Sequence, residues 1–288
     1  MANRRELVKR RKAVRNIRKI TRTMELIATS RFQKAYSDAI AGRPYSDKLG
    51  ELVADLARAA GELRHPLMET NDADRESLLV ITSNRGLCGA YNANVLRSAV
   101  GWLDDQENPV DVHMVGKKGL SYFRFLGREV AESTTSIDDR PRFPQIEPVA
   151  QAQIDRFLAG EISSVSVVYM RFISTGVQRP EVIRLLPLTP DLVGADSDTT
   201  GPAIEYEISP SPEALLDDLL PASVRQRLFQ CFLDAAVSEQ VARMVAMKAA
   251  TDAAGDMIKD ISRQYNRARQ THITMELLDI VGGAAALE

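Results

Sequence analysis

Two long helical patterns at the ends of the chain, residues 3–41 and 222–287, constrain the fold more than any other feature of the sequence. Neither pattern can stand alone, because a single amphipathic helix in water is only marginally stable and needs a partner for its apolar face. The residues between the two segments do not continue this helical pattern. The economical arrangement is an antiparallel coiled coil of the two end segments, with the middle of the chain as an inserted domain.

Apolar residues within the end segments recur at alternating steps of four and three, which is typical of a coiled-coil seam. The predicted seam of the first segment is Ala13, Ile17, Ile20, Met24 and Ile27. The last segment supplies stripes at Val237, Val241, Met244, Met247, Ile258, Ile261, Tyr265, Ile273, Leu277, Ile280 and Ala284. Because proline lacks a backbone donor, Pro44 predicts a kink or break in the first helix, and Pro221 an interruption in the last.

The middle of the chain alternates strand patterns with helical ones, which predicts a mixed, Rossmann-like α/β sheet domain. The expected strands are 78–83, 111–115, 129–133, 163–173, 182–188 and 203–208, the expected helices lie near 92–103, 118–126 and 149–158, and 191–202 reads as a polar loop. The predicted division is an N-terminal coiled-coil segment over 1–76, the α/β domain over 77–208 and a C-terminal coiled-coil helix over 209–288.

Charge is distributed unevenly along the chain. Residues 1–34 carry 12 Lys and Arg against 2 Glu, whereas the whole chain has a net charge of −2. Such a cationic helix needs an acidic partner, which could be nucleic acid, anionic lipid or a carboxylate-rich protein surface. A basic coiled coil that binds nucleic acid is therefore one alternative, although no aromatic residue accompanies the basic residues before Phe32.

Residues suited to catalysis do not form a recognisable group. The turn Asn84–Gly89 lies between a strand and a helix, but it lacks the GK[ST] ending of a P-loop and the GxGxxG spacing, so a structural turn is the better interpretation. Cys88 has no histidine in a recognisable arrangement, and a buried thiol is expected. We therefore expect no catalytic, cofactor or metal site, with a nucleotide-dependent enzyme built on the α/β domain as the second alternative.

The expected cellular compartment follows from the absence of membrane-span and signal-peptide patterns in the sequence. With 44% hydrophobic and 26% charged residues, the composition is that of a folded soluble protein. No apolar run approaches the roughly 18 residues of a membrane span, and the basic N-terminus is not followed by the apolar segment of a signal peptide. Cys88 and Cys231 are too far apart in sequence to suggest a zinc or disulfide motif. These features predict a cytoplasmic protein.

Three separated motifs resemble the gamma subunit of F-type ATP synthases, in the same order and over essentially the full length. They are RNIRKITRTMELIATSRFQKA (15–35), SNRGLCGAYN (83–92) and VAMKAATDAAGDMIKDISRQYNRARQTHITMELLDIVGGAAAL (245–287). The departures are small; Asn84, for example, stands where that family often has Asp.

This resemblance implies a non-catalytic rotor of the central stalk, one copy per complex. It would couple transmembrane proton or other ion flow to ATP synthesis or hydrolysis on the beta subunits. The implied partners are the alpha and beta subunits, the epsilon subunit and the membrane c-ring, and not nucleic acid. The implied location is the cytoplasmic face of the cell membrane, as a peripheral protein. Carried over by motif, the contacts with a beta subunit would be made by Met24, Arg269, Gln270, Thr274 and Glu276.

Overall fold

The computed structural model describes residues 4–59, 65–188 and 212–285, which divide into two compact units. The coiled-coil unit comprises residues 4–30 and 243–285. The sheet unit comprises the described residues of 31–242. Helices α1 (Arg4–Ala59) and α5 (Pro212–Ala285), of 56 and 74 residues, contribute to both units.

Both long helices continue through their prolines. Pro44 lies inside α1 and Pro221 inside α5, so the predicted break and interruption are wrong. A proline removes its own hydrogen bond to the preceding turn, but tertiary packing on both sides can hold the helix together. Around Pro221, the fully buried Leu220 and Val224 supply that packing.

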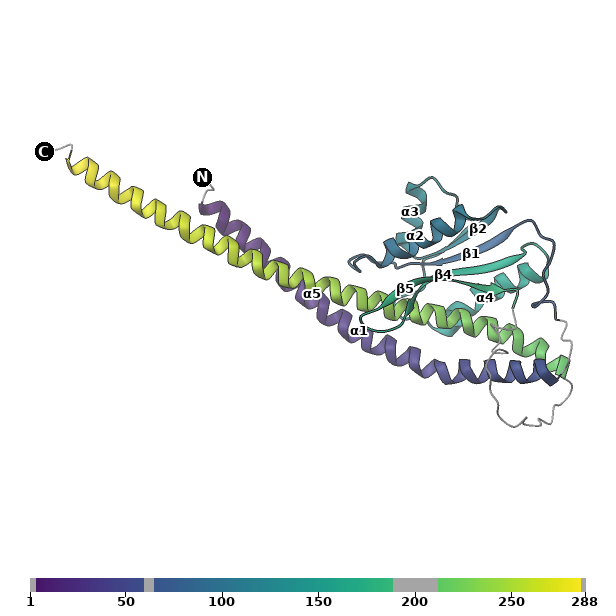
Figure 1. Ribbon diagram of the computed structural model, residues 1–288. Helices are drawn as coiled ribbons and strands as arrows, with labels where there is room; N and C mark the ends of the chain where they lie inside the picture. The colour runs from purple at the N-terminus through teal and green to yellow at the C-terminus, as the bar shows by residue number, and fades with distance from the viewer. Residues whose placement is uncertain (1–3, 60–64, 189–211, 286–288) are drawn as a thin grey trace. The chain divides into compact units, whose positions relative to one another are not determined.

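In the coiled-coil unit, the two helices run antiparallel, as the ends of the sequence predict. Figure 1 shows the purple start of α1 alongside the yellow-green part of α5, running in the opposite direction. Leu7 and Val14 of α1 form one buried cluster with Ala254 and Ile261 of α5. The coiled coil of the two end helices is thus confirmed.

The sheet unit contains a five-stranded sheet in the order β3-β2-β1-β4-β5. Four strands are parallel to one another: β1 (Glu76–Ile81), β2 (Val110–Val115), β3 (Glu132–Thr134) and β4 (Ser164–Phe172). Strand β5 (Gln178–Leu186) is antiparallel to β4. The predicted mixed α/β domain is therefore confirmed.

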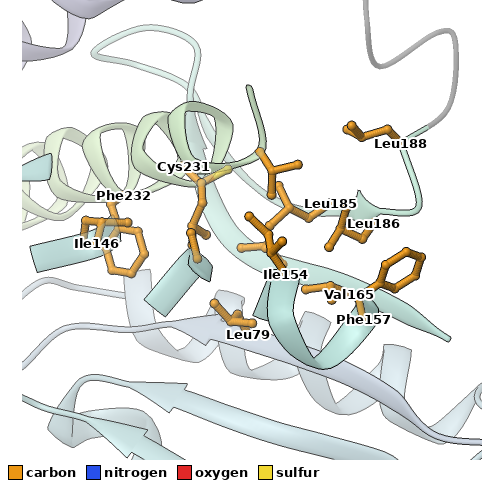
Figure 2. Close-up of a cluster of buried hydrophobic side chains, with 14 of the residues drawn as sticks. Leu79, Ile146, Ile154, Phe157, Val165, Leu185, Leu186, Leu188, Cys231 and Phe232 are labelled. Carbon is orange, nitrogen blue, oxygen red and sulfur yellow. The ribbon is translucent and has the colours of Figure 1, made fainter. Parts of the chain in front are cut away.

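Helices cover both faces of this sheet. Helices α2 (Tyr91–Asp104) and α3 (Lys117–Phe125) share a cluster with Leu78 and Val80 on one face. Helix α4 (Phe143–Leu158) and the sheet-unit part of α5 share another with Leu79 and Ile81 on the opposite face. Successive residues of β1 thus point to alternate layers. Figure 2 shows the second cluster, in which side chains of α4 and α5 meet those of β1, β4 and β5.

Some element limits differ from the prediction. Helix α4 begins at Phe143 rather than near Val149, because Pro148 is accommodated inside it. The expected strand over 203–208 and the polar loop over 191–202 lie outside the described residues. The domain limits at 76/77 and 208/209 stay a prediction, which limited proteolysis of the full chain would support by cutting first near those positions.

Candidate partner-contact surface

The seam of the coiled coil is built from small and polar residues as much as from large apolar ones. On α1 the buried residues recur every seven positions, at Leu7, Val14, Thr21 and Ala28. On α5 the seam follows steps of four and three, through Met247, Thr251, Ala254, Ile258, Ile261, Tyr265 and Ala268. At its centre the hydroxyl groups of Thr21 and Thr251 are hydrogen-bonded at 2.8 Å. This seam therefore includes a polar contact that helps to fix its register.

The predicted seam of α1 is wrong by one residue. Ile17, Ile20 and Ile27 are 52%, 58% and 48% exposed, whereas Val14, Thr21 and Ala28, each one position after a predicted seam residue, are buried. One residue along a helix is a rotation of about 100°. The stronger apolar column of α1 thus lies on the outside of the coiled-coil unit, and Met24, in that same column, is half-buried.

Basic side chains share this outer surface. Within residues 4–30, every Lys and Arg except Arg11 is exposed. Arg11 is half-buried because its guanidinium lies over the ring of Tyr265, 5.2 Å from the centroid. The outside of the coiled coil therefore combines large apolar side chains with a dense positive charge, a combination suited to a partner that offers both apolar and acidic groups.

The last part of α5 extends beyond the seam. From Arg269 to Gly282 every residue is exposed, because the start of α1 lies opposite the seam residues that end at Ala268. Large apolar side chains that are half or more exposed occupy this segment: Ile273, Met275, Leu277, Leu278, Ile280 and Val281. The stripe expected at Ile273, Leu277 and Ile280 is thus not covered by α1.

Four of the five predicted contact residues lie together on this segment. Arg269, Gln270, Thr274 and Glu276 are all exposed within about two turns of α5. The Thr274 hydroxyl donates to the Gln270 carbonyl at 3.0 Å. Met24 is not among them. Because Thr21 lies opposite Thr251, Met24 lies near the level of residue 248, roughly 30 Å along α5 from Arg269 at 1.5 Å per residue.

The amides at the start of α3 are bonded to the end of β1 and to the glycine-rich turn Asn84–Gly89. The first three amides of that helix, Lys117–Gly119, donate to Asn84 Oδ1, the Ser83 carbonyl and the Thr82 hydroxyl at 3.1, 3.1 and 3.0 Å. Leu87 and Gly89 adopt φ values of 64° and 56°, as a tight turn requires. The predicted structural turn is confirmed, and it connects β1 to the beginnings of two helices.

Both thiols are buried. Cys88 is 2% exposed and accepts a hydrogen bond from Asn92 Nδ2 at 3.2 Å, in agreement with the prediction. Burial raises the pKa of Cys231 to about 12, which disfavours the thiolate that nucleophilic chemistry requires. Residues 4–59, 65–188 and 212–285 contain no cluster of three or more His, Cys, Asp or Glu placed to hold a metal ion. In the same ranges, no helix is long and apolar enough to cross a membrane.

A family model described as ATP synthase matches residues 3–287 of the chain. A relative named ATP synthase gamma chain, from Rhodopirellula baltica, is 45% identical over 297 residues, with 100% of both chains covered. The chain belongs to the gamma-chain family of ATP synthases. A second gamma chain, from Dehalococcoides mccartyi strain 195, is 41% identical over 289 residues, again with 100% of both covered. The resemblance of the three sequence motifs is thereby confirmed.

Solved structures share the fold of this gamma-chain family member. One is the rotor of the Euglena gracilis mitochondrial ATP synthase in rotational state 1, with a TM-score of 0.64 and 16% identity, covering 94% of this chain and 98% of that one. Another comes from the OSCP/F1/c-ring assembly of the same enzyme in rotational state 3, with a TM-score of 0.66 and 19% identity, covering 99% and 94%. None of these relatives supports the nucleic-acid-binding alternative.

Proposed function

We infer that this chain is the rotor subunit of the central stalk of a rotary ATP synthase, and that it couples ion flow to ATP synthesis or hydrolysis on partner beta subunits. The observation that carries this inference is the full-length membership in the gamma-chain family at 45% identity. The chain itself is non-catalytic. This follows from its membership in the gamma-chain family.

The surface of the coiled-coil unit suits this role physically. Two wound helices resist twisting better than one, because seam contacts such as Thr21–Thr251 connect them. Exposed apolar residues and arginines on the outside give the coiled coil unequal sides. As such a coiled coil rotates, each of three surrounding beta subunits meets a different surface in turn, which is the condition for three different nucleotide affinities.

The partners we propose are alpha and beta subunits around the coiled coil, together with an epsilon subunit and a membrane c-ring. Exposed cations on α1 complement acidic loops of a protein partner. Since the c-ring lies in a membrane, the chain would be a peripheral protein on the cytoplasmic face of the cell membrane.

The decisive experiment is co-purification. The tagged full-length chain, expressed in its native cell, should bring down alpha- and beta-type subunits in a complex that hydrolyses ATP, while the isolated chain should not turn over. A chain recovered without those subunits, or an isolated chain with nucleotide turnover of its own, would contradict the rotor function. Salt-dependent DNA binding by the isolated chain would favour the nucleic-acid alternative instead.

We propose that Met24, Arg269, Gln270, Thr274 and Glu276 contact a beta subunit. The support is their motif match and the exposure of the last four on α5. Met24→Lys would place a cation opposite acidic groups of beta and create an ion pair that must break in every turn, so it should lower ATP-driven proton pumping more than ATP hydrolysis. Equal pumping by Met24→Lys and by the neutral control Met24→Leu, in reconstituted vesicles, would refute the placement of Met24.

A further inference from the structure

A short loop of the sheet unit, residues 135–141, is joined to α1 by two ion pairs of opposite polarity. Asp139 on the loop pairs with Arg31 on the helix. Its neighbour Arg140 donates from Nε and Nη2 to the two carboxylate oxygens of Asp38, at 2.7 and 3.1 Å. The second pair is a two-bond fork, which fixes direction as well as distance.

The loop is anchored firmly to the sheet. Asn84, just past the end of β1, donates from its side-chain amide to the carbonyls of Ile137 and Thr135, at 2.8 and 3.3 Å. The Ile137 side chain is buried in the core beneath α4 and α5. Arg85 also lies 3.6 Å from the Asp139 carboxylate. The loop is therefore a fixed part of the sheet edge, and its ion pairs tie α1 to that edge.

The other contacts of α1 in the sheet unit are apolar. Ala35 and Ala39 pack against α5, and the rings of Phe32 and Tyr36 lie against Phe172 of β4. A slip of the helix would lose this packing, but the packing itself sets no repulsion against another register. Polar and charged partners are what usually specify register between packed helices.

The two ion pairs add a charge pattern to that packing. Arg31 and Asp38 are seven residues apart, so they lie on the same face of α1 and roughly 10 Å apart along its axis. A shift of the helix by seven residues in one direction would set Arg31 against Arg140. A shift in the other direction would set Asp38 against Asp139. Either slip replaces attraction by repulsion between like charges.

We propose that loop 135–141 is a register lock, which holds α1 against the sheet so that torque passes between them without slip. The proposal rests on the rotor function inferred above. Arg31, Asp38, Asp139 and Arg140 are then positioning residues for coupling. They lie within the sheet unit and are distinct from the residues proposed to contact a beta subunit.

The test uses the complete complex, assembled with its alpha, beta, epsilon and c-ring subunits and reconstituted in vesicles. The variants are Asp38→Arg, Arg140→Asp and the double exchange Asp38→Arg/Arg140→Asp. Arg128→Asp is the matched control, because it reverses one member of another exposed ion pair, Arg128–Asp104, which does not involve α1. ATP hydrolysis, proton pumping and the melting temperature of the full chain are measured for each variant.

We expect each single reversal to raise the proportion of ATP turnovers without pumping by about fivefold, with little change in melting temperature because both side chains are at the surface. The exchange restores attraction between helix and loop but gives both pairs the same polarity, so pumping should recover only in part, and Arg128→Asp should leave pumping unchanged. Single reversals that pump like the wild type, or an exchange that pumps no better than they do, would overturn the register lock alone. If the wild-type chain does not assemble with alpha and beta subunits, the rotor function is overturned as well.

Discussion

The sheet unit and the coiled-coil unit use apolar residues in opposite ways. In the sheet unit, Leu78, Leu79 and Val80 are all fully buried, because helices cover both faces of β1. In the coiled-coil unit, Ile17 and Ile20 are more than half exposed while Thr21 occupies the seam. The sheet unit thus has a complete core of its own, whereas the coiled coil keeps much of its apolar surface for partners. An apolar pattern in this sequence therefore includes residues kept for contacts with partner subunits as well as residues buried in the seam between α1 and α5.

Removing a core side chain from the sheet unit should have the largest effect on stability. Leu79→Ala deletes buried methyl groups between the sheet and the helices α4 and α5, and we expect it to lower the free energy of unfolding by about 3 kcal/mol. Urea unfolding of the isolated full-length chain would measure the loss.

The matched substitution in the coiled-coil unit is Ile20→Ala. Because Ile20 is 58% exposed, we expect a change within about 0.5 kcal/mol in the isolated chain, together with weaker assembly with alpha and beta subunits. An equal loss of stability for the two variants would show that the contrast between the units does not hold.

The projecting end of α5 should give the next largest effect, on binding rather than on stability. Arg269→Ala should weaken association with alpha and beta subunits by about 2 kcal/mol, or roughly thirtyfold, if this arginine is a central contact. Titrated reassembly of the complex, read by its ATP hydrolysis, measures the affinity. Arg263→Ala is the control, since Arg263 is exposed and pairs with Asp260 on the same helix. Equal affinities for both variants would remove Arg269 from the proposed contact.

Alkaline pH should lower the stability of the sheet unit through Cys231, a buried thiol with no counterpart in the coiled-coil unit. Burial raises the pKa of this thiol to about 12 in the folded protein, above its ordinary value of 9.0, so between these values the unfolded thiol loses its proton while the folded thiol keeps it. The unfolded state then binds fewer protons, and stability falls as pH rises through this window. At pH 10 we expect a loss of about 1.4 kcal/mol from this group. The variant Cys231→Ala should show a correspondingly smaller loss between pH 8 and pH 10; an unchanged loss would exclude Cys231 as its source.

The fold could be predicted from the sequence where a residue pattern was compatible with only one kind of structure. Strand β1 contains the apolar run Leu78–Ile81 and β4 the run Val167–Met170, which a sheet covered on both faces can bury, and both strands lie close to their expected positions. The seam of α1 was predicted one residue away from its place because Ile20 and Ile27 are more apolar than Thr21 and Ala28, although Thr21 and Ala28 are the buried residues. Nothing local distinguishes an apolar column kept for a partner from one kept for the neighbouring helix.

The ion pairs of loop 135–141 could not have been found in the sequence. Arg140 and Asp38 are 102 positions apart, and exposed charges carry no periodic signal. The contact residues on α5 were accessible only through the resemblance of whole motifs. As residues of the same type on the same helix, Arg269 and Arg263 cannot be told apart by residue type alone. The seam ends at Ala268 because of where α1 begins, which the sequence of α5 does not show.

The smallest effect concerns the polar contact inside the seam. The Thr251 hydroxyl donates to Thr21 Oγ1 at 2.8 Å, and the Thr21 hydroxyl in turn donates to the Arg18 carbonyl at 3.2 Å. Thr251→Val keeps the shape but leaves the buried Thr21 oxygen without its donor, and we expect a loss of about 1 kcal/mol by urea unfolding. Thr271→Val, on the exposed part of α5, should have no measurable effect.

The double variant Thr21→Val/Thr251→Val decides what this contact does. With both hydroxyl groups replaced by methyl groups of similar shape, no polar atom of the pair is left buried and unpaired, so stability should return to the wild-type value or exceed it. If the hydroxyl pair instead stabilises the seam directly, the double variant should be no more stable than Thr251→Val. Recovery would mean that the threonine pair fixes the register of the coiled coil and does not add to its stability. The sheet unit differs, because there each buried side chain adds to the stability of the core.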